Sequence, residues 1–186
     1  MTIKFKGCHP TNFRKGRSGY KPEVIVIHIM DGTLYGTDSH FMTQRPNPSS
    51  AHYGIGCEWD DRASPNWPVA VHQYVNDEDT AFHAGWIKKP TWQHFRKRLI
   101  GNIQTNINPN YYTIGIECQG KPEDIWKEKM YITLADLVAI EANAWQIPID
   151  RDHIIGHREI DMVNKPNCPG QCDLEKLVAM AKEVKV

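Results

Sequence analysis

Residues 152–172 read DHIIGHREIDMVNKPNCPGQC and place a histidine, a lysine and two cysteines behind a short apolar run. The β-branched pair Ile154 and Ile155 favours a strand, and the glycine that follows disfavours a helix. His157 then lies where this strand passes into its connecting loop. The stretch therefore predicts a strand that carries an imidazole at its end.

The same stretch presents a thiol further along the chain. Ten residues intervene between His157 and Cys168, and Pro166 and Pro169 surround the cysteine. Each proline fixes a φ angle and removes a backbone donor, so Cys168 is held on a stiff turn, which suits a metal ligand. Cys172 stands at the entrance of the last helix and is better interpreted as a small buried hydrophobe.

A third metal ligand is available on a second strand. Residues 23–30 read EVIVIHIM, and this continuous apolar run is typical of a strand buried on both faces. His28 lies at the end of the run, where open sheets present their chemistry. Catalytic zinc typically takes three protein ligands and leaves the fourth position to water. His28, His157 and Cys168 would satisfy that count.

Five sequence blocks follow one another along the chain: IVIHIMDGT, SSAHYGI, DTAFHAG, YTIGIECQG, and IIGHREI with NCPG behind it. In this order they resemble the zinc N-acetylmuramoyl-L-alanine amidases of the type 2 family, which also contains phage lysozyme-type amidases and animal peptidoglycan recognition proteins. The resemblance runs from Val24 to the C-terminus, and five ordered blocks are much more specific than any one alone. It implies that the zinc ligands are His28, His157 and Cys168.

Glu117 is the candidate general base. Hydrolysis at zinc still needs a base for the water and an acid for the leaving amine. Glu117 ends the apolar strand TIGIE, where partial burial would raise its pKa into the working range. For an isolated Glu, an ion pair with a lysine or arginine would be the better interpretation. The resemblance favours the base, because cytosolic muropeptide amidases place Glu here, whereas phage lysozyme-type members use a Tyr where this chain has Ala51.

Lys165 is the candidate for stabilising the developing oxyanion. Family members usually place this lysine two residues before the third ligand, whereas Lys165 stands three residues before Cys168. Either the loop adapts by one residue or Lys165 is a solvated surface lysine, and both alternatives stay open.

Three residues are assigned to substrate binding. The HAG block borders the substrate groove in the family, which implies a binding role for His83, and His52 and Trp86 are placed in the same group. For each histidine the alternative is a hydrogen-bonded structural role, since three metal ligands are already supplied.

The order of apolar runs predicts an α/β fold, with one mixed central β-sheet flanked by helices in a single domain. Residues 1–20 are expected to form a surface arm and residues 21–186 the catalytic amidase domain. The acidic stretch 58–68 is expected to be a surface loop whose Trp59 and Trp67 rim the groove. Helices are expected over residues 38–44 behind Thr37, over residues 92–103, from Thr133 to Trp145, and after Asp173.

The composition argues against several classes of partner and structure. Lys plus Arg equals Asp plus Glu at 22 each among 186 residues, so net charge makes no case for nucleic acid or an anionic membrane. No apolar run approaches the ~20 residues of a transmembrane helix. Five cysteines at irregular spacing argue against a disulfide framework. We expect a monomer made in the cytoplasm without a signal peptide, acting there on muropeptides or on the cell wall after release.

Three functions of different class remain. The resemblance implies zinc-dependent hydrolysis of the amide between N-acetylmuramic acid and L-alanine, in peptidoglycan or muropeptides. The alternative is a module that binds muropeptide without cutting it; such family members typically lack the cysteine ligand, which is present here as Cys168. The third is an unrelated zinc peptidase, which would cut plain peptides instead.

Overall fold

The computed structural model describes residues 1–57 and 69–185, so the expected loop over residues 58–68, with Trp59 and Trp67, lies outside the described residues. A six-stranded sheet forms the centre, in the order β1-β5-β4-β9-β3-β10. Within this sheet β4 and β5 run antiparallel, and the other neighbouring strands run parallel. The strands are Ile3–Phe5 (β1), Val69–Gln73 (β5), Tyr53–Cys57 (β4), Thr113–Cys118 (β9), Val24–Ile29 (β3) and Ile154–Gly156 (β10). The predicted mixed α/β sheet is confirmed.

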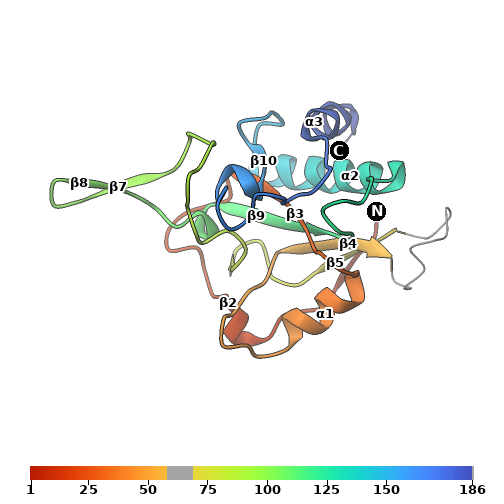
Figure 1. Ribbon diagram of the computed structural model, residues 1–186, viewed down its shortest axis with the longest axis horizontal. Helices are drawn as coiled ribbons and strands as arrows, with labels where there is room; N and C mark the ends of the chain where they lie inside the picture. Colours follow the sequence, from red (N-terminus) through yellow and green to blue (C-terminus); the bar gives the residue numbers. More distant parts are fainter. Residues whose placement is uncertain (58–68, 186) are drawn as a thin grey trace.

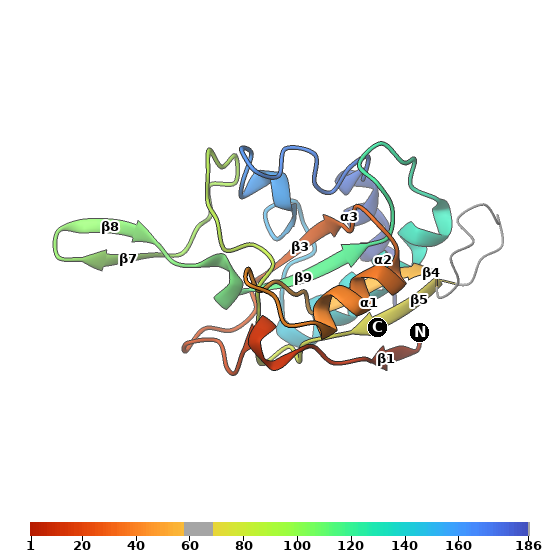
Figure 2. The same cartoon turned by 60° about the horizontal axis from the view of Figure 1, so that its bottom comes forward.

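Helices cover both faces of this sheet (Figure 1). Helices α2 (Glu128–Trp145) and α3 (Leu174–Glu183) lie on one face, and α1 (Leu34–Met42) lies on the other (Figure 2). The main core fills the space between the sheet and the first pair of helices. It joins alternate residues of β3 and β9 to the apolar stripes of α2 and α3, including Ile25, Ile27, Ile114, Ile116, Leu134, Leu137, Val138, Leu177 and Val178. The apolar stripes of the last two helices therefore pack against this face of the sheet.

The alternation of side chains along each strand decides which face of the sheet carries the candidate site residues. Ile25 and Ile27 of β3 point into the core, so His28 points to the opposite face of the sheet. Glu117 is the register partner of His28 on the adjacent β9. Partners in neighbouring strands share a face, so the two side chains emerge side by side on the face that carries α1.

Smaller elements connect the sheet and helices. Strand β2 (Phe13–Arg14) pairs with β6 (Thr80–Ala81), and β7 (Lys97–Ile100) pairs with β8 (Ile103–Asn106). Three short 3-10 helices are η1 (Pro10–Asn12), η2 (Pro109–Tyr111) and η3 (His157–Glu159). None of the helices in the described part of the chain combines the length and apolarity needed to span a bilayer.

The first twenty residues differ from the expected surface arm. Ile3–Phe5 forms the edge strand β1, which pairs in parallel with β5. Arg17 is buried, and its guanidinium donates to the backbone carbonyls of Thr113 and Asp77. This segment therefore packs into the domain. Its strands are only two or three residues long, too short for a periodic pattern to reveal them.

Helix α1 begins earlier than predicted. Its N-cap is Thr33, whose hydroxyl accepts the N–H of Gly36, so the expected cap at Thr37 is wrong. Helix α2 also begins before the expected Thr133, at Glu128. Its first flanking residue, Lys127, makes no capping hydrogen bond through its side chain, so the sequence carries no start signal there.

The helix expected over residues 92–103 is also wrong. Trp92 is buried in a loop, whereas Leu99 and Ile103 lie on the exposed hairpin β7–β8. Gly101 has a φ of 61° and forms the two-residue turn with Asn102. Gly-Asn between two strand-forming runs is a hairpin signal. It outweighed the helical spacing of Trp92, Phe95, Leu99 and Ile103.

Candidate metal centre and active site

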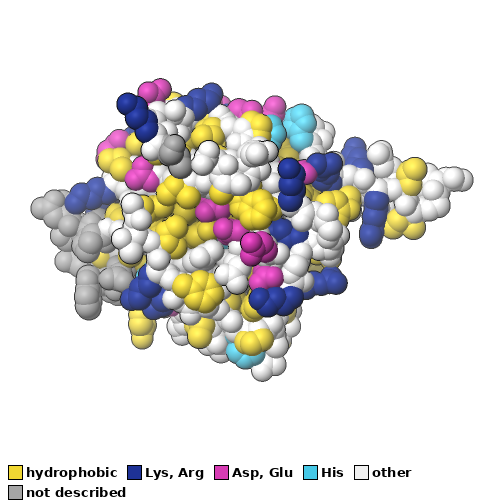
Figure 3. All heavy atoms as spheres, turned by 180° about the vertical axis from the view of Figure 1, so that it is seen from behind, with side chains coloured by type: hydrophobic (Ala, Val, Ile, Leu, Met, Phe, Trp, Pro, Cys, Tyr) yellow, Lys and Arg dark blue, Asp and Glu magenta, His cyan; other side chains and the backbone are white. Residues whose placement is uncertain are grey.

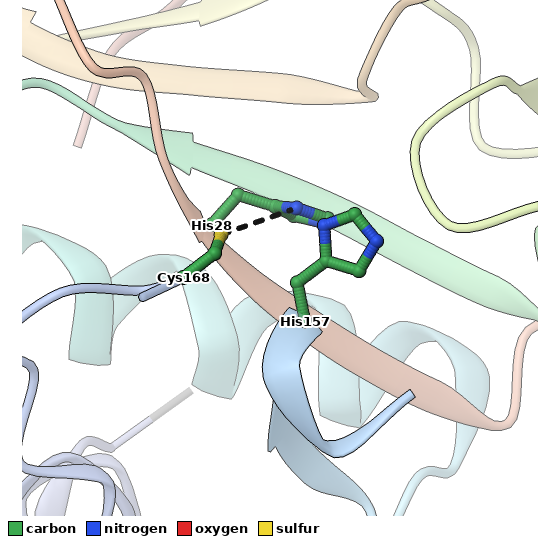
Figure 4. Close-up of side chains that lie close together, drawn as sticks. All are labelled: His28, His157 and Cys168. Carbon is green, nitrogen blue, oxygen red and sulfur yellow. Dashed lines mark hydrogen bonds between the residues drawn. The ribbon is translucent and has the colours of Figure 1, made fainter. Parts of the chain in front are cut away.

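Three elements bring the predicted metal ligands together (Figure 4). His28 lies near the end of β3, His157 follows β10 directly, and Cys168 lies on the loop before α3. One ligand atom from each of the three lies within 4.8 Å of the others, and all three residues are buried. Because β3 and β10 are parallel neighbours, their carboxyl ends place the two imidazole rings 4.5 Å apart.

The Cys168 loop is fixed by backbone hydrogen bonds. The N–H of Arg158 donates to the carbonyl of Cys168 over 2.8 Å, and the N–H of Cys168 donates to the carbonyl of Lys165 over 3.1 Å. The thiol itself accepts from the N–H of Ile29 over 3.4 Å. The sulfur is therefore held against the end of β3 beside His28.

The donor set fits a zinc ion. Burial lowers the pKa of His28 well below its ordinary value and that of His157 to about 4, so both imidazoles are neutral at physiological pH. A neutral imidazole offers the lone pair that a metal needs. Burial raises the pKa of Cys168 to about 12, so the thiol would give up its proton when a metal binds. Imidazole nitrogen and thiolate sulfur are both zinc ligands, and three protein ligands are the number that a catalytic zinc typically takes.

A hydrogen-bond chain fixes which nitrogen of His28 faces the other ligands. The Thr113 hydroxyl donates to the carbonyl of Pro109 over 2.9 Å, and so accepts from Nε2 of His83 over 3.1 Å. Nδ1 of His83 then carries no proton and accepts from Nε2 of His28 over 3.0 Å. This leaves the lone pair of His28 on Nδ1, the atom that lies 3.9 Å from the Cys168 sulfur.

Glu117 stands beside this cluster. Its Oε1 lies 3.9 Å from Nδ1 of His28, and its Oε2 is buried without a hydrogen-bond partner among the described residues. Burial raises the pKa of Glu117 to about 7, against a smaller opposing effect of the Lys165 ammonium. A carboxyl group with that pKa can accept a proton and return it near neutral pH. An unpartnered buried oxygen is costly, and a metal-site water would give it a partner.

A cavity of about 840 Å³ opens onto these residues. Its lining includes all three ligands, Glu117, Lys165 and His83, and the opposite wall comes from α1 through residues such as Thr37 and His40. This volume lies within the range that holds small organic ligands. Lys165 is exposed on its loop and also borders the cavity.

Two of the residues assigned to substrate binding do not line the cavity. His52 is fully buried, and its Nδ1 accepts the N–H of Gly115 over 3.0 Å while its Nε2 lies 2.7 Å from the Arg17 guanidinium. His52 therefore has a structural position with no surface for substrate. Trp86 is 72% exposed outside the cavity lining, with the Lys88 ammonium 5.8 Å from its ring.

Two features of the site were not predicted from the sequence: Thr113, and the residues of α1 that line the cavity. Thr113 shares a strand face with Glu117, four residues on, so the alternation along β9 could have indicated it. The α1 residues carry no comparable signal, because they meet the site only through the packing of α1 against the sheet.

Known proteins resemble this chain in both sequence and structure. The profile of the N-acetylmuramoyl-L-alanine amidase family matches residues 18–171. The 1,6-anhydro-N-acetylmuramyl-L-alanine amidase AmpD of Haemophilus influenzae is 30% identical over 113 residues, which are 60% of this chain and 53% of that protein. The chain thus spans about half the length of this curated relative.

Solved structures share the fold across most of the chain. The N-acetylmuramoyl-L-alanine amidase LysC of Clostridium intestinale superposes with a TM-score of 0.63 at 15% identity, covering 100% of this chain and 99% of that one. AmpDh3 of Pseudomonas aeruginosa, solved in complex with anhydromuramic pentapeptide, gives a TM-score of 0.59 at 20% identity, covering 86% and 59%. At these identities the likeness concerns the fold alone.

Proposed function

The chain belongs to the N-acetylmuramoyl-L-alanine amidase family, and from this membership we propose that it hydrolyses the amide between the lactyl group of N-acetylmuramic acid and L-alanine. The substrate class is peptidoglycan or its muropeptide fragments. One observation supports the proposal most strongly. The carboxylate of Glu117, whose Oε2 is buried without a hydrogen-bond partner among the described residues, lies on the wall of a large cavity, beside a buried group of two imidazoles and a thiol.

His28, His157 and Cys168 would hold the zinc ion. When bound, zinc polarises the scissile carbonyl and makes a water molecule more acidic. Glu117 accepts the proton of the attacking water and returns it to the nitrogen of the leaving L-alanine. Its pKa of about 7 in the metal-free protein suits both transfers, because neither protonation state is strongly favoured at neutral pH.

Lys165, which borders the cavity, would stabilise the charge that develops on the carbonyl oxygen. A cation beside a partly enclosed cavity stabilises an oxyanion more than it would in water. The Lys165 charge already acts on this site, since it lowers the pKa of both Glu117 and His157. The wall of the cavity formed by α1 would hold the sugar and peptide on either side of the bond.

The second candidate is a module that binds muropeptide without cleaving it. A binding module gains nothing from an ionisable carboxyl group with a buried oxygen that lacks a hydrogen-bond partner, and such an oxygen lowers stability. The position of Glu117 therefore favours hydrolysis. All groups needed for the reaction come from one chain, so we propose that a monomer is active, on muropeptides in the cytoplasm or on the wall after release.

Product analysis tests this proposal. Purified protein is incubated with zinc and either peptidoglycan or soluble muropeptides, and the fragments are identified by mass. We expect free lactyl ends on muramic acid and peptides that begin at L-alanine, and the Glu117→Gln variant as control should release almost none. Binding without cleavage would support the binding module, and cleavage of glycan bonds or of plain peptides would contradict the assignment.

A further inference from the structure

The hairpin β7–β8 projects away from the body of the domain in two views (Figure 1, Figure 2). Its apolar side chains are unusually exposed: Leu99 by 73%, Ile100 by 55% and Ile103 by 69%. A two-stranded hairpin without a packing partner is only marginally stable in water, and exposed clusters of aliphatic groups commonly mark contact surfaces. The tip of this hairpin is therefore a candidate interaction surface.

The base of the hairpin is firmly attached. Arg96 pairs with the Glu23 carboxylate through its Nε at 2.6 Å, and the N–H of Ile107 donates to the carbonyl of Arg96 over 2.7 Å. Ile107 is buried in a small core with Trp92 and Tyr112. The hairpin is thus anchored at its base and presents its tip outward.

Charge is distributed unevenly around this hairpin, although the whole chain is neutral. No Asp or Glu occurs in residues 80–116, whereas this stretch contains the cations Lys88, Lys89, Arg96, Lys97 and Arg98. Lys97 and Arg98 are exposed on β7 itself. Hydrophobic and basic side chains lie next to each other on the projecting hairpin (Figure 3). The balance of charge over the whole chain conceals this local excess.

The register of the hairpin orders these groups by depth. Ile100 pairs with Ile103 beside the turn, and Leu99 pairs with Gln104 on the opposite face. Both faces of the tip are therefore aliphatic. Arg98 and Lys97 follow on β7, also on alternate faces, so each face carries one cation about 7 Å behind its aliphatic residue. Such a gradient fits an environment that changes from hydrocarbon to anionic groups over a comparable distance.

We propose that the tip of β7–β8 docks the protein onto a phospholipid bilayer with anionic headgroups. Leu99, Ile100 and Ile103 enter the acyl boundary, while Lys97 and Arg98 contact lipid phosphates. A wall polysaccharide fits less well, because residues 97–106 contain no aromatic side chain for a sugar to stack on. Pairing with a second copy through β7 fits less well too, because it would bring the like charges of Lys97 and Arg98 together.

Vesicle sedimentation tests this docking without any use of hydrolysis. The probes are vesicles of phosphatidylcholine alone and vesicles containing about one quarter phosphatidylglycerol, at low and high salt. The apolar test variant is Leu99→Ser with Ile103→Ser, and its matched control is Ile125→Ser, at an aliphatic residue that is 89% exposed elsewhere. The charge test variant is Lys97→Gln with Arg98→Gln, and its matched control is Lys182→Gln with Lys185→Gln, at exposed positions near the C-terminus.

The wild type is expected to sediment with anionic vesicles and to be released at high salt. Loss of both hairpin cations should weaken binding about thirtyfold, since each cation near such a surface contributes on the order of fivefold. The apolar variant should weaken it about tenfold or more, whereas both controls should bind as the wild type does. Melting temperatures should stay unchanged, because all substituted side chains are exposed.

Three results would overturn the proposal. One is equal sedimentation of the wild type with neutral and anionic vesicles, or with neither. Another is wild-type binding by both hairpin variants. The third is a failure to bind vesicles while the hairpin serves another contact. That contact would be a dimer, seen by analytical ultracentrifugation, or binding to an anionic wall polymer, and in either case the hairpin variants would lose it.

Discussion

Glu117 shows how one residue can be costly for the fold and useful for chemistry. Burial raises its pKa from 4.5 to about 7, so the ionised form is disfavoured in the folded protein. The contribution of Glu117 to the free energy of unfolding is fully present below pH 4.5, and it is lost as the pH rises through about 7. Glu117→Gln removes the charge and keeps the shape, so at about pH 8 the variant should be at least as stable as the wild type.

Turnover of Glu117→Gln should fall by about 10²–10⁴, or about 3–5 kcal/mol of barrier, because the base is gone. Bound zinc and muropeptide affinity should stay near wild type. Glu183→Gln, at an exposed position near the end of α3, is the matched control. Melting temperature, zinc content and turnover are measured on one preparation. A Glu117 variant that melts earlier yet turns over normally would mean that the carboxylate is only structural.

Cys168 is the ligand whose chemistry can be exchanged. Cys168→Ser should lose zinc, because a neutral hydroxyl is a much weaker ligand than a thiolate, whereas Cys168→Asp should keep part of it through a carboxylate oxygen. Cys8→Ser is the control, since the Cys8 thiol is far along the chain and donates to the carbonyl of Phe41. Metal analysis after dialysis gives the answer. Wild-type zinc content in Cys168→Ser would exclude Cys168 as a ligand.

His83 holds His28 in place through the bond between Nδ1 of His83 and Nε2 of His28. We expect His83→Ala to weaken zinc affinity about 10–100-fold, as loss of an outer partner of a metal ligand commonly does. Thr113→Val should show a smaller loss in the same direction, because it removes only the next bond in the chain. Competition with a chromogenic chelator measures both. Unchanged zinc affinity in both variants would exclude a positioning role for the hydrogen bonds that link Thr113, His83 and His28.

Three of the predicted site residues that the structure brings together share one property. His28, His157 and Glu117 each stand at the end of an apolar strand, and parallel strands bring such ends to one edge. His52 also lies next to a strand, but it points into a buried network around Arg17, which no local pattern indicates. Thr113 was overlooked because a hydroxyl on a strand is common, and only the hydrogen bond to His83 gives it meaning.

Among the elements, α3 begins at an N-cap residue that can be predicted from the sequence. Asp173 was predicted as its N-cap, and its carboxylate accepts the N–H of Lys176 over 3.0 Å. Asp173→Ala should lower the free energy of unfolding by about 1 kcal/mol, within a range of about 0.5–2 kcal/mol. Urea unfolding measures this loss. Asp152→Ala, at a side chain that is 67% exposed, should change stability by less than about 0.5 kcal/mol. Equal losses in the two variants would contradict the cap.

Elements were predicted well where burial sets the pattern and poorly where it does not. The apolar runs of β3 and β9 were clear because both of their faces are covered. The hairpin β7–β8 was read as a helix because its aliphatic residues face solvent, so their spacing reflects no core. Strands β1 and β2 gain their structure from distant partners on β5 and β6, which a local window cannot contain.

For the whole molecule, the order of strands is what assembles the site. β3 lies between β9 and β10 although these strands are far apart in the chain, and this order brings His28, Glu117 and His157 to one edge. Family resemblance implied this grouping from ordered sequence blocks. Periodicity alone could not predict this grouping, because it indicates helices and strands but not which strands lie side by side.

The most direct test of the proposed zinc site is a titration of metal-free protein with zinc, in which release of L-alanine peptides from muropeptide is followed at each addition. The site of two imidazoles and a thiol lies within a single chain. We predict that activity is absent without metal, rises in proportion to added zinc and saturates at one zinc per chain. Full activity in protein freed of zinc, or activity that saturates only well beyond one zinc per chain, would contradict it.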